Sequence, residues 1–381
     1  MRVLIDYRAA LRERSGVGEY AHEISRALLS ACAGGCSNGT PLELTLFSSS
    51  WKDRLTPAPE LARASIVDRR VPVRVLNFAW HRLEWPAAES LAGRSFDVVH
   101  SLHPLLMPAR RAAQVITIHD LDFLAHPERT HAEIRRDYPP LAHAHAKRAD
   151  HVVVNSQFTA REVGRLLDVP PERLSVVPPG RPPWTARAHP PPDGGYLLFV
   201  GTLEPRKNIG TLLDAYERIV RRRRDFPPLV LAGKTTDAAR PWLDRIARAP
   251  LAGRVRHAGY VAASERRALF EGAAALVHAA FEEGFGLTVL EAMTTGVPVV
   301  AANRGAIPEV AGDAALLIDP DDADALAGAL ERLVDDEALR DRMSATGVAR
   351  AGLFTWEKAA DATMAAYHAA IAFRASRRGG A

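Results

Sequence analysis

Short apolar runs alternate with stretches of helical periodicity along the first half of the chain. The apolar runs predict strands over residues 3–6, 42–47, 96–100, 115–118 and 152–154. The periodic stretches predict helices over residues 19–30, 132–148 and 159–167. Strands that alternate with helices favour a parallel sheet covered on both faces.

A proline-rich stretch interrupts this pattern at residues 178–195, which contain seven prolines. Such a segment enters neither a helix interior nor a central strand. We therefore expect it to link two domains.

The alternation starts again after this stretch. Strands are predicted over residues 196–201, 229–233, 255–259, 275–278 and 297–302. Helices are predicted over residues 209–222, 265–272, 287–295, 323–334 and 356–373. The fold class is therefore α/β, with two Rossmann-like doubly wound domains. Ligands bind beyond the carboxyl ends of the strands in such folds, so we expect the site in a central cleft that both domains face.

Composition and charge narrow the classes of function. The chain has 381 residues, of which 47% are hydrophobic and 25% charged, as in globular proteins. No apolar run approaches the roughly 18 residues of a membrane span, so we expect a cytoplasmic protein. Residues 1–187 contain 25 Lys and Arg against 20 Asp and Glu, a balance of +5 within a net charge of +4. This excess suits an anionic ligand or peripheral contact with the inner membrane surface. Nucleic acid is disfavoured, because the basic residues are not interleaved with aromatic ones.

Glu283 and Glu291 bracket a glycine-containing turn that opens the predicted helix at 287. Gly284 and Gly286 let the backbone approach a ligand closely, and a helix N-terminus attracts anions. The two carboxylates can each accept hydrogen bonds from a pair of hydroxyls. This pattern fits a nucleotide sugar, and a solvated loop remains an equal alternative on these residues alone.

Three further segments carry candidate ligands at strand ends. Arg206 and Lys207 lie in a turn between a strand and a helix, where cations can neutralise a diphosphate, although they can equally be surface charges. His119 follows the strand over 115–118, where it is either structural or directed at the cleft. Gly16 and Gly18 follow the first strand and can form an anion-binding turn, a weak signal without a third glycine.

Together these segments resemble the family 4 retaining glycosyltransferases of the GT-B fold. Four stretches carry the resemblance, which spans nearly the whole chain: residues 15–20, 117–121 with 126–128, 200–208, and 281–300 with 307–310. It implies a first, acceptor-side domain over 1–183 and a nucleotide-sugar-binding domain over 184–355, with the last helix, within 356–381, crossing back to the first domain.

The resemblance also implies roles for individual residues. Glu283 and the segment Gly284, Phe285, Gly286 and Leu287 would hold the donor sugar, and Glu291 would hold the ribose. Arg206 and Lys207 would bind the diphosphate. His119 would lie against the transferred sugar, and Gly16 and Gly18 near the diphosphate or the acceptor. Many relatives have Arg where this chain has Thr202, which makes the assignment of the cation pair less certain.

The expected reaction moves a hexose from a nucleoside diphosphate sugar to a hydroxyl of a glycan or lipid-linked acceptor, with retention. Mannosyl transfer from GDP-mannose for surface polysaccharides is favoured weakly, and a UDP-sugar is the alternative. No cofactor or metal is expected, since cations and helix dipoles can stabilise the leaving diphosphate. Acceptor pockets are expected in the loops 8–18 and 101–111. A non-catalytic polysaccharide-assembly subunit and a sugar-nucleotide epimerase or phosphorylase remain the rival classes.

Overall fold

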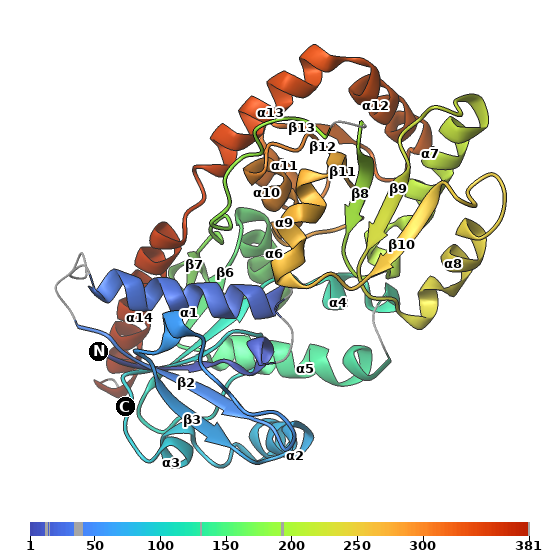
Figure 1. The fold of residues 1–381 in the computed structure, drawn as a ribbon. Helices are drawn as coiled ribbons and strands as arrows, with labels where there is room; N and C mark the ends of the chain where they lie inside the picture. The colour runs from blue at the N-terminus through green and yellow to red at the C-terminus, as the bar shows by residue number, and fades with distance from the viewer. Residues whose placement is uncertain (12–13, 15, 34–40, 130–131, 192–193, 380–381) are drawn as a thin grey trace. The chain divides into compact units, whose positions relative to one another are not determined.

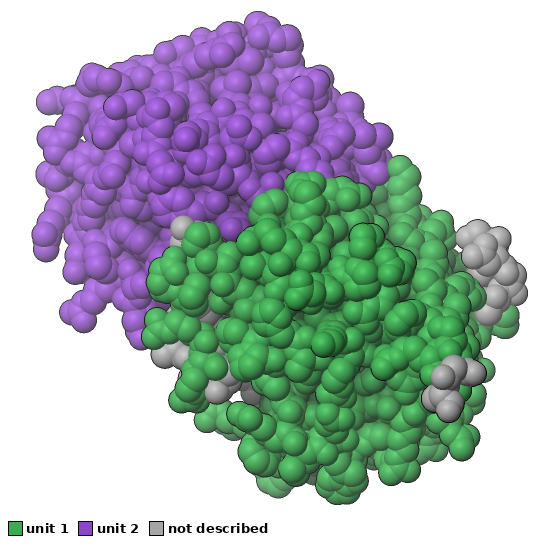
Figure 2. All heavy atoms as spheres, turned by 180° about the vertical axis from the view of Figure 1, so that it is seen from behind, with its two compact units in different colours: residues 1–180, 355–381 green, residues 181–354 purple. Residues whose placement is uncertain are grey.

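The computed structural model describes residues 1–381 apart from 12–13, 15, 34–40, 130–131, 192–193 and 380–381. The chain forms two compact units, coloured separately in Figure 2. Unit 1 comprises Met1–Gly180 and Thr355–Ala381, and unit 2 comprises Arg181–Phe354. The first boundary falls inside the proline-rich stretch, three residues before the expected position. Most of that stretch therefore belongs to unit 2, where the backbone N–H of Arg187 donates to the carbonyl of Thr295 at 3.1 Å.

Unit 1 contains a seven-stranded parallel sheet in the order β3-β2-β1-β4-β5-β6-β7. Its strands are β1 (Arg2–Asp6), β2 (Glu43–Ser49), β3 (Ser65–Arg69), β4 (Val98–Ser101), β5 (Ala113–Ile118), β6 (His151–Val154) and β7 (Leu174–Val176). The five inner strands match the predicted ones, whereas the edge strands β3 and β7 were not predicted. Both edge strands are only partly buried, so their sequences lack a long apolar run.

Apolar residues cover both faces of this sheet, as alternating positions of β1 show. Val3 and Ile5 pack with α1 (Val17–Ala33) and α14 (Trp356–Gly379), and Leu4 lies in a separate core with residues of α2 (Val73–Phe78) and α3 (Ala88–Ala92). Further along the sheet, α5 (Ala132–Arg148) and α6 (Gln157–Leu167) pack on β5 and β6. Burial on both faces explains why the inner strands are nearly continuous apolar runs.

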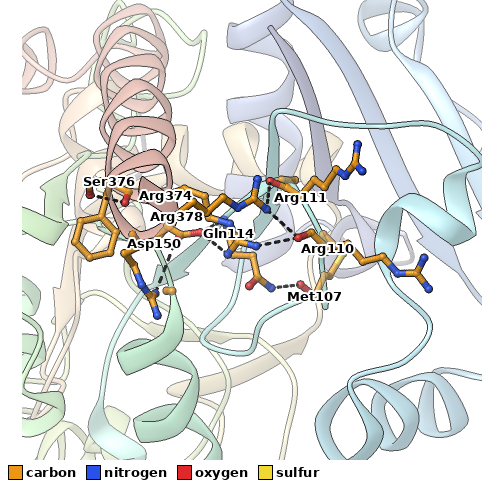
Figure 3. A network of polar contacts seen from close by, with 12 residues as sticks. Met107, Arg110, Arg111, Gln114, Asp150, Arg374, Ser376 and Arg378 are labelled. Atoms are coloured by element: carbon orange, nitrogen blue, oxygen red, sulfur yellow. Dashed lines mark hydrogen bonds and ion pairs between the residues drawn. The ribbon is translucent and has the colours of Figure 1, made fainter. Parts of the chain in front are cut away.

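The last helix, α14, is an integral part of unit 1, packed against α1 (Figure 1). The hydroxyl of its Tyr367 lies 2.9 Å from Nδ1 of the buried His100. Near its end, Arg374 lies 3.2 Å from the carboxylate of Asp150, which is fully buried (Figure 3). The guanidinium groups of Arg374 and Arg378 also donate to the carbonyl of Arg110 (Figure 3). These contacts fix the C-terminal turns of α14 against the amino ends of β5 and β6.

Unit 2 contains a six-stranded parallel sheet in the order β10-β9-β8-β11-β12-β13. Its strands are β8 (Tyr196–Val200), β9 (Leu229–Ala232), β10 (Val255–Gly259), β11 (Ala273–His278), β12 (Val299–Ala302) and β13 (Ala315–Ile318). One face packs on α7 (Ile209–Arg222) and α12 (Ala323–Asp335). The other packs on α9 (Ala263–Glu271), α10 (Leu287–Thr294) and α11 (Ile307–Ala311). A short α8 (Arg240–Ile246) and a long α13 (Glu337–Ala351) complete the unit.

The strand order reverses once in each sheet, which defines where a ligand is expected. In unit 1 this switch point lies between β1 and β4, and in unit 2 between β8 and β11. Crevices at such points open beyond the carboxyl ends of the strands. None of the helices in the described part of the chain is both long and apolar enough to cross a membrane.

Candidate active site

Two loops meet at the switch point of unit 2. The loop after β8 contains Arg206 and Lys207, and the loop after β11 contains Glu283. The backbone N–H of Phe281 donates to the carbonyl of Arg206 at 2.9 Å. The side chain of Asn208 donates to the carbonyls of Ala279 and Pro320, at 3.1 and 2.7 Å. These bonds hold the two loops in one arrangement.

Glu283 and Lys207 form an ion pair in this arrangement. Nη1 of Arg206 lies 3.9 Å from the same carboxylate oxygen, and its Nε lies 2.7 Å from Glu204. Burial alone would raise the pKa of Glu283, but Lys207, His278 and Arg206 outweigh it and hold this pKa well below its usual range. The carboxylate therefore stays ionised at neutral pH, so that it can accept hydrogen bonds from hydroxyls.

His278 is a further member of this group that the sequence analysis missed. It is the last residue of β11, it is buried, and its Nε2 lies 3.4 Å from Glu283 Oε2. Its Nδ1 lies 3.4 Å from the hydroxyl of Thr288 in the first turn of α10. Burial lowers the pKa of His278, which favours the neutral imidazole. Its position at a strand end was the available signal, the same one that marked His119.

The turn after Glu283 depends on glycine. Gly286 caps α10 with a φ of +98°, which an L side chain rarely adopts. The ring of Phe285 is buried in the core of unit 2, so this residue can offer a ligand only its backbone. Leu287 is the first residue of α10, as predicted.

Gly305 supports the same turn from the loop after β12. Its φ is +62°, and a Cβ there would lie 2.5 Å from the carbonyl oxygen of Glu283. The neighbouring N–H of Ala306 donates to that carbonyl at 2.9 Å. Two backbone contacts thus fix the position of Glu283.

Glu291 lies in the second turn of α10 and has its own cation. Nη1 of Arg266, from α9, lies 2.6 Å from Glu291 Oε1, and both side chains are nearly fully buried. The two glutamates, which were expected to have separate roles, also have different basic partners: Lys207 pairs with Glu283, and Arg266, which was not predicted, pairs with Glu291.

The candidates in unit 1 lie at the carboxyl ends of its central strands. His119 follows β5, and its Nε2 lies 3.1 Å from the carbonyl oxygen of Leu102, which follows β4. The ring of Tyr20 packs edge-on against His119, with centroids 4.9 Å apart. Tyr20 lies in the first turn of α1, two residues after Gly18. Gly16, just before this helix, has a φ of +53°. Burial lowers the pKa of His119 to about 4, so its imidazole is neutral at pH 7.

Unit 1 has an ionic group of its own at the switch point between β1 and β4, and the sequence did not predict it. Asp6, at the end of β1, is buried and accepts two hydrogen bonds from the guanidinium of Arg8, at 2.8 and 2.6 Å. Nε2 of His103 lies 3.0 Å from the same carboxylate. Burial acts to raise the pKa of Asp6, but Arg8 and His103 hold it far below its usual range.

A cavity of about 870 Å³ opens beside these residues within unit 1. Its lining comes from the segments after β1, β2 and β3 and from the start of α1. It includes Arg8, Lys52 and Arg74, as well as Trp51, Val73 and Gly18. From the segment 8–18, the residues Arg8, Ala9, Leu11, Val17 and Gly18 line this cavity. Within the described ranges, no three His, Cys, Asp or Glu side chains gather in a way that could hold a metal ion.

Comparison with known proteins defines the class. The family model described as Glycosyltransferase Family 4 matches residues 14–183, and the model described as Glycosyl transferases group 1 matches residues 182–350. The chain belongs to the family 4 glycosyltransferases and has the GT-B fold. It is therefore a glycosyltransferase.

Individual relatives agree with this assignment. The chain is 32% identical to the O-antigen chain mannosyltransferase B of Escherichia coli over 316 residues, which are 78% of this chain and 81% of that protein. It is 33% identical to a D-inositol 3-phosphate glycosyltransferase of Nocardioides over 249 residues, 59% of this chain and 54% of the relative.

Solved structures share the fold at lower identity. Sucrose-phosphate synthase from Thermosynechococcus elongatus superposes with a TM-score of 0.73 at 20% identity, covering 94% of this chain and 96% of its own. WaaG, a glycosyltransferase involved in lipopolysaccharide biosynthesis, gives a TM-score of 0.69 at 16% identity, covering 95% and 99%. The Anabaena protein Alr3699/HepE, solved with UDP and glucose, gives 0.65 at 17% identity, covering 96% and 98%.

Proposed function

We propose that this glycosyltransferase moves a hexose, with retention, from a nucleoside diphosphate sugar to a hydroxyl of a glycan or lipid-linked acceptor in surface polysaccharide biosynthesis. The observation that carries the proposal is the group Glu283, Lys207 and Arg206 at the switch point of unit 2. A carboxylate can accept hydrogen bonds from sugar hydroxyls, and the two cations next to it can bind a diphosphate. One small site therefore offers partners for both parts of a nucleotide sugar. The relationship to an O-antigen mannosyltransferase supports the surface polysaccharide.

Each part of the nucleotide sugar has proposed binding residues in unit 2. Lys207 and Arg206 bind the diphosphate, since an ammonium has three donors and can contact phosphate while it remains bonded to Glu283. Glu283 accepts hydrogen bonds from sugar hydroxyls beside the backbone of Gly284, Phe285, Gly286 and Leu287. Glu291, oriented by Arg266, accepts from the ribose hydroxyls.

The chemical step breaks the anomeric C–O bond and forms a bond from the same carbon to the acceptor oxygen. The acceptor proton passes to the leaving diphosphate oxygen, so that no separate carboxylate base is required. Lys207 and Arg206 stabilise the charge that develops on that oxygen. His119, neutral at pH 7, contacts the transferred sugar as a hydrogen-bond partner and not as a cation.

Unit 1 supplies the proposed acceptor side. The cavity beside Gly18 contains cations and an indole ring, which suits a sugar next to a phosphate group. Gly18, at the start of α1, forms part of its wall, and Gly16 precedes that helix. The segments that line this cavity differ from those that bind the donor, so acceptor and donor specificity can change independently.

The donor is tested with a thermal-shift panel of GDP, UDP and ADP, each alone and as a sugar conjugate. A ligand at a hundredfold excess over its Kd stabilises the folded protein by about 2.7 kcal/mol, which is readily measured. We expect GDP and GDP-mannose to give the largest shift. A larger shift with UDP compounds would favour the UDP-sugar alternative, and HepE is a protein of the same fold solved with UDP.

Catalysis is tested by release of nucleoside diphosphate with donor and acceptor present, and retention by the anomeric configuration of the product in NMR. A non-catalytic assembly subunit would bind donor without turnover.

We propose that no metal is needed, and full activity in EDTA is the expected result. Loss of activity in EDTA that Mg²⁺ or Mn²⁺ restores would overturn the metal-free mechanism.

A further inference from the structure

The side chains of Asp6, Arg8 and His103 form a polar group in unit 1 that has no role in the proposed donor site of unit 2. Asp6 ends β1, Arg8 begins the short helix Arg8–Ala10, and His103 follows β4. β1 and β4 are neighbours in the parallel sheet, so their carboxyl ends bring the three side chains together. This edge is the one at which ligands bind in such sheets.

The carboxylate of Asp6 is used entirely within this group. Its side chain is 1% exposed, and Oδ1 accepts hydrogen bonds from Nε and the backbone N–H of Arg8, at 2.8 and 3.1 Å. Oδ2 accepts from Nη2 of Arg8 at 2.6 Å and lies 3.0 Å from Nε2 of His103. Asp6 therefore fixes the orientation of both neighbours and is not itself accessible to a ligand.

His103 adds a hydrogen bond to the group but no charge. Its Nδ1 accepts from the backbone N–H of Leu105 at 3.2 Å, so this nitrogen carries no proton. Nε2 then carries the proton and donates a hydrogen bond to Asp6. The imidazole is neutral in this arrangement, so Arg8 alone balances the charge of Asp6. The three side chains together carry no net charge.

Arg8 keeps two hydrogen-bond donors that no described residue uses. A guanidinium has five N–H groups in a rigid plane. Nε and Nη2 each donate one to Asp6, and Nη1 donates one to Oδ1 of Asn77 at 2.8 Å. One N–H on Nη1 and one on Nη2 remain. The guanidinium also stacks on the buried ring of Trp80, 4.8 Å from its centroid, so its plane is fixed.

Arg8 is also part of the wall of the cavity in unit 1. Its side chain is only 10% exposed, so it lies at a recessed part of that wall. Lys52 and Arg74 line the same cavity and are exposed. The described lining residues include no carboxylate. The cavity therefore has one recessed cation, which Asp6 neutralises, and two exposed cations whose charge no lining residue balances.

We propose that Arg8 binds two neighbouring hydroxyl oxygens of an uncharged acceptor sugar, and that Lys52 and Arg74 bind an anionic group attached to that sugar. Two N–H groups held in one plane match a pair of adjacent hydroxyl oxygens. A phosphate gains less from Arg8, because Asp6 already balances the charge of the guanidinium. The acceptor is thus oriented with its sugar in the recessed part of the cavity and its anionic group toward solvent. This inference rests on the proposed transfer and names the acceptor contacts of the same reaction.

The test measures sugar binding to the full-length protein without donor. The uncharged probes are the methyl glycosides of mannose, glucose and galactose, and the anionic probes are the 6-phosphates of the same sugars. Calorimetric titration and saturation-transfer NMR give each Kd. We expect wild-type protein to bind at least one glycoside. Arg8→Lys keeps the positive charge beside Asp6 but loses the planar set of donors, and it should weaken binding of that glycoside at least tenfold.

Asp6→Asn tests whether the carboxylate sets the preference for an uncharged sugar. This change keeps the shape of the side chain and leaves the charge of Arg8 unbalanced. The Kd of the sugar phosphate, divided by the Kd of the glycoside, should therefore fall at least tenfold. A purely structural role of Asp6 would weaken both probes alike, and an unchanged ratio would contradict the proposal.

Arg54→Lys is the matched control, because Arg54 pairs with Asp68 at 2.9 Å in the same unit and does not line the cavity. It should leave every Kd unchanged, and circular dichroism verifies that each variant is folded. Wild-type protein that binds none of the three glycosides, or unchanged binding in Arg8→Lys, would overturn the proposal. So would loss of glycoside binding in Glu283→Gln but not in Arg8→Lys, which would place the sugar in unit 2.

The proposed transfer is tested separately, by nucleotide binding and by release of nucleoside diphosphate. If those two fail while Arg8 still binds the glycoside, the proposed function is wrong and the sugar site remains. If nucleoside diphosphate is released but Arg8→Lys has no effect on glycoside binding, the transfer stands and the sugar site is wrong.

Discussion

The guanidinium of Arg266 lies 2.6 Å from the carboxylate of Glu291, and α9 and α10 hold the two side chains together in a nearly buried position. This pair gives Glu291 a fixed orientation, which its proposed role toward the two ribose hydroxyls requires. Removing one side chain of this pair takes the main opposite charge from the other, which stays buried, at a cost of about 3 kcal/mol.

We therefore predict that Glu291→Ala and Arg266→Ala both lower the free energy of unfolding by about 3 kcal/mol. The two variants should differ in their effect on ligand binding. Glu291→Ala should weaken nucleoside diphosphate binding by about tenfold or more, through the loss of charged hydrogen bonds. The double variant Arg266→Met with Glu291→Gln should recover stability but not affinity. Urea titration and calorimetry measure the two quantities, and recovered affinity in the double variant would exclude a ribose role for Glu291.

Lys207 is predicted to act mainly on turnover. Loss of one preorganised donor to a developing oxyanion typically lowers kcat by about 10²–10³. We expect Lys207→Ala to show this loss in nucleoside diphosphate release, with Lys207→Arg retaining part of the activity. Arg218→Ala, at a partly exposed cation in an ion pair with Asp324 on the surface of α7, is a control that should leave the rate unchanged. Release at the wild-type rate by Lys207→Ala would show that the diphosphate is bound elsewhere.

Gly305 offers a test of how closely Glu283 must be positioned. Alanine at this position must adopt a φ of +62°, at a cost of about 1–2 kcal/mol, and its Cβ would displace the carbonyl of Glu283. We predict lower stability together with a fall in kcat for Gly305→Ala. Gly328→Ala is the matched control, because its site in α12 has no atom within 4 Å of the new Cβ. That change should stabilise the protein by about 0.5–1 kcal/mol with unchanged activity. Unchanged kcat in Gly305→Ala would mean that the backbone of Glu283 tolerates displacement.

Acid should destabilise unit 1 before unit 2. Burial lowers the pKa of five histidines in unit 1 to about 3 or 4: His81, His100, His119, His145 and His151. The pKa of a histidine in the unfolded chain is about 6.5. At a pH between that value and the lowered pKa values of the folded protein, the unfolded chain binds more protons than the folded one. Stability therefore falls as the pH drops from 7 to 5, by about 2 kcal/mol for each such histidine.

Replacing His100 tests this link between histidine protonation and stability. His100 is suitable because it is not one of the proposed catalytic residues. In His100→Gln, the loss of stability between pH 7 and pH 5 should be smaller by about 2 kcal/mol, whatever the variant loses at pH 7. His368→Gln, at an exposed position of α14, is the control for the substitution of a histidine by glutamine. Urea midpoints at the two pH values measure both, and an unaltered dependence in His100→Gln would contradict the neutral state of the buried imidazole.

The sequence predicts the central strands of both sheets because those strands are buried on both faces and must be apolar throughout. It misses the edge strands β3, β7 and β13 and the helix α13, which are partly exposed and have mixed residues whose periodicity is weak. The position of Glu283 after a strand and before a helix was correctly predicted, as was that of Lys207. Their direct pairing was not, because the two loops are 76 residues apart and meet only through the order of the strands.

Arg266 and His278 are site residues that the sequence did not predict. Arg266 is one of two basic residues in α9, and the sequence gives no reason to select it over Arg267 as the partner of Glu291. His278 carried a usable signal, since it ends a buried strand next to the glycine-containing turn. The roles of all these residues toward donor and acceptor stay predictions until the variants are measured.

The route of the backbone has a consequence for synthesis on the ribosome. Residues 181–354 are inserted between the two segments of unit 1, and the N–H of Arg181 donates to the carbonyl of Phe354 at 3.0 Å where the insertion begins and ends. Unit 2 is therefore complete while the core of unit 1 still lacks Trp356 and Tyr367. The domain that is translated first is the last to close its core, and until then part of its apolar surface stays uncovered, as in the aggregation-prone intermediates of larger proteins.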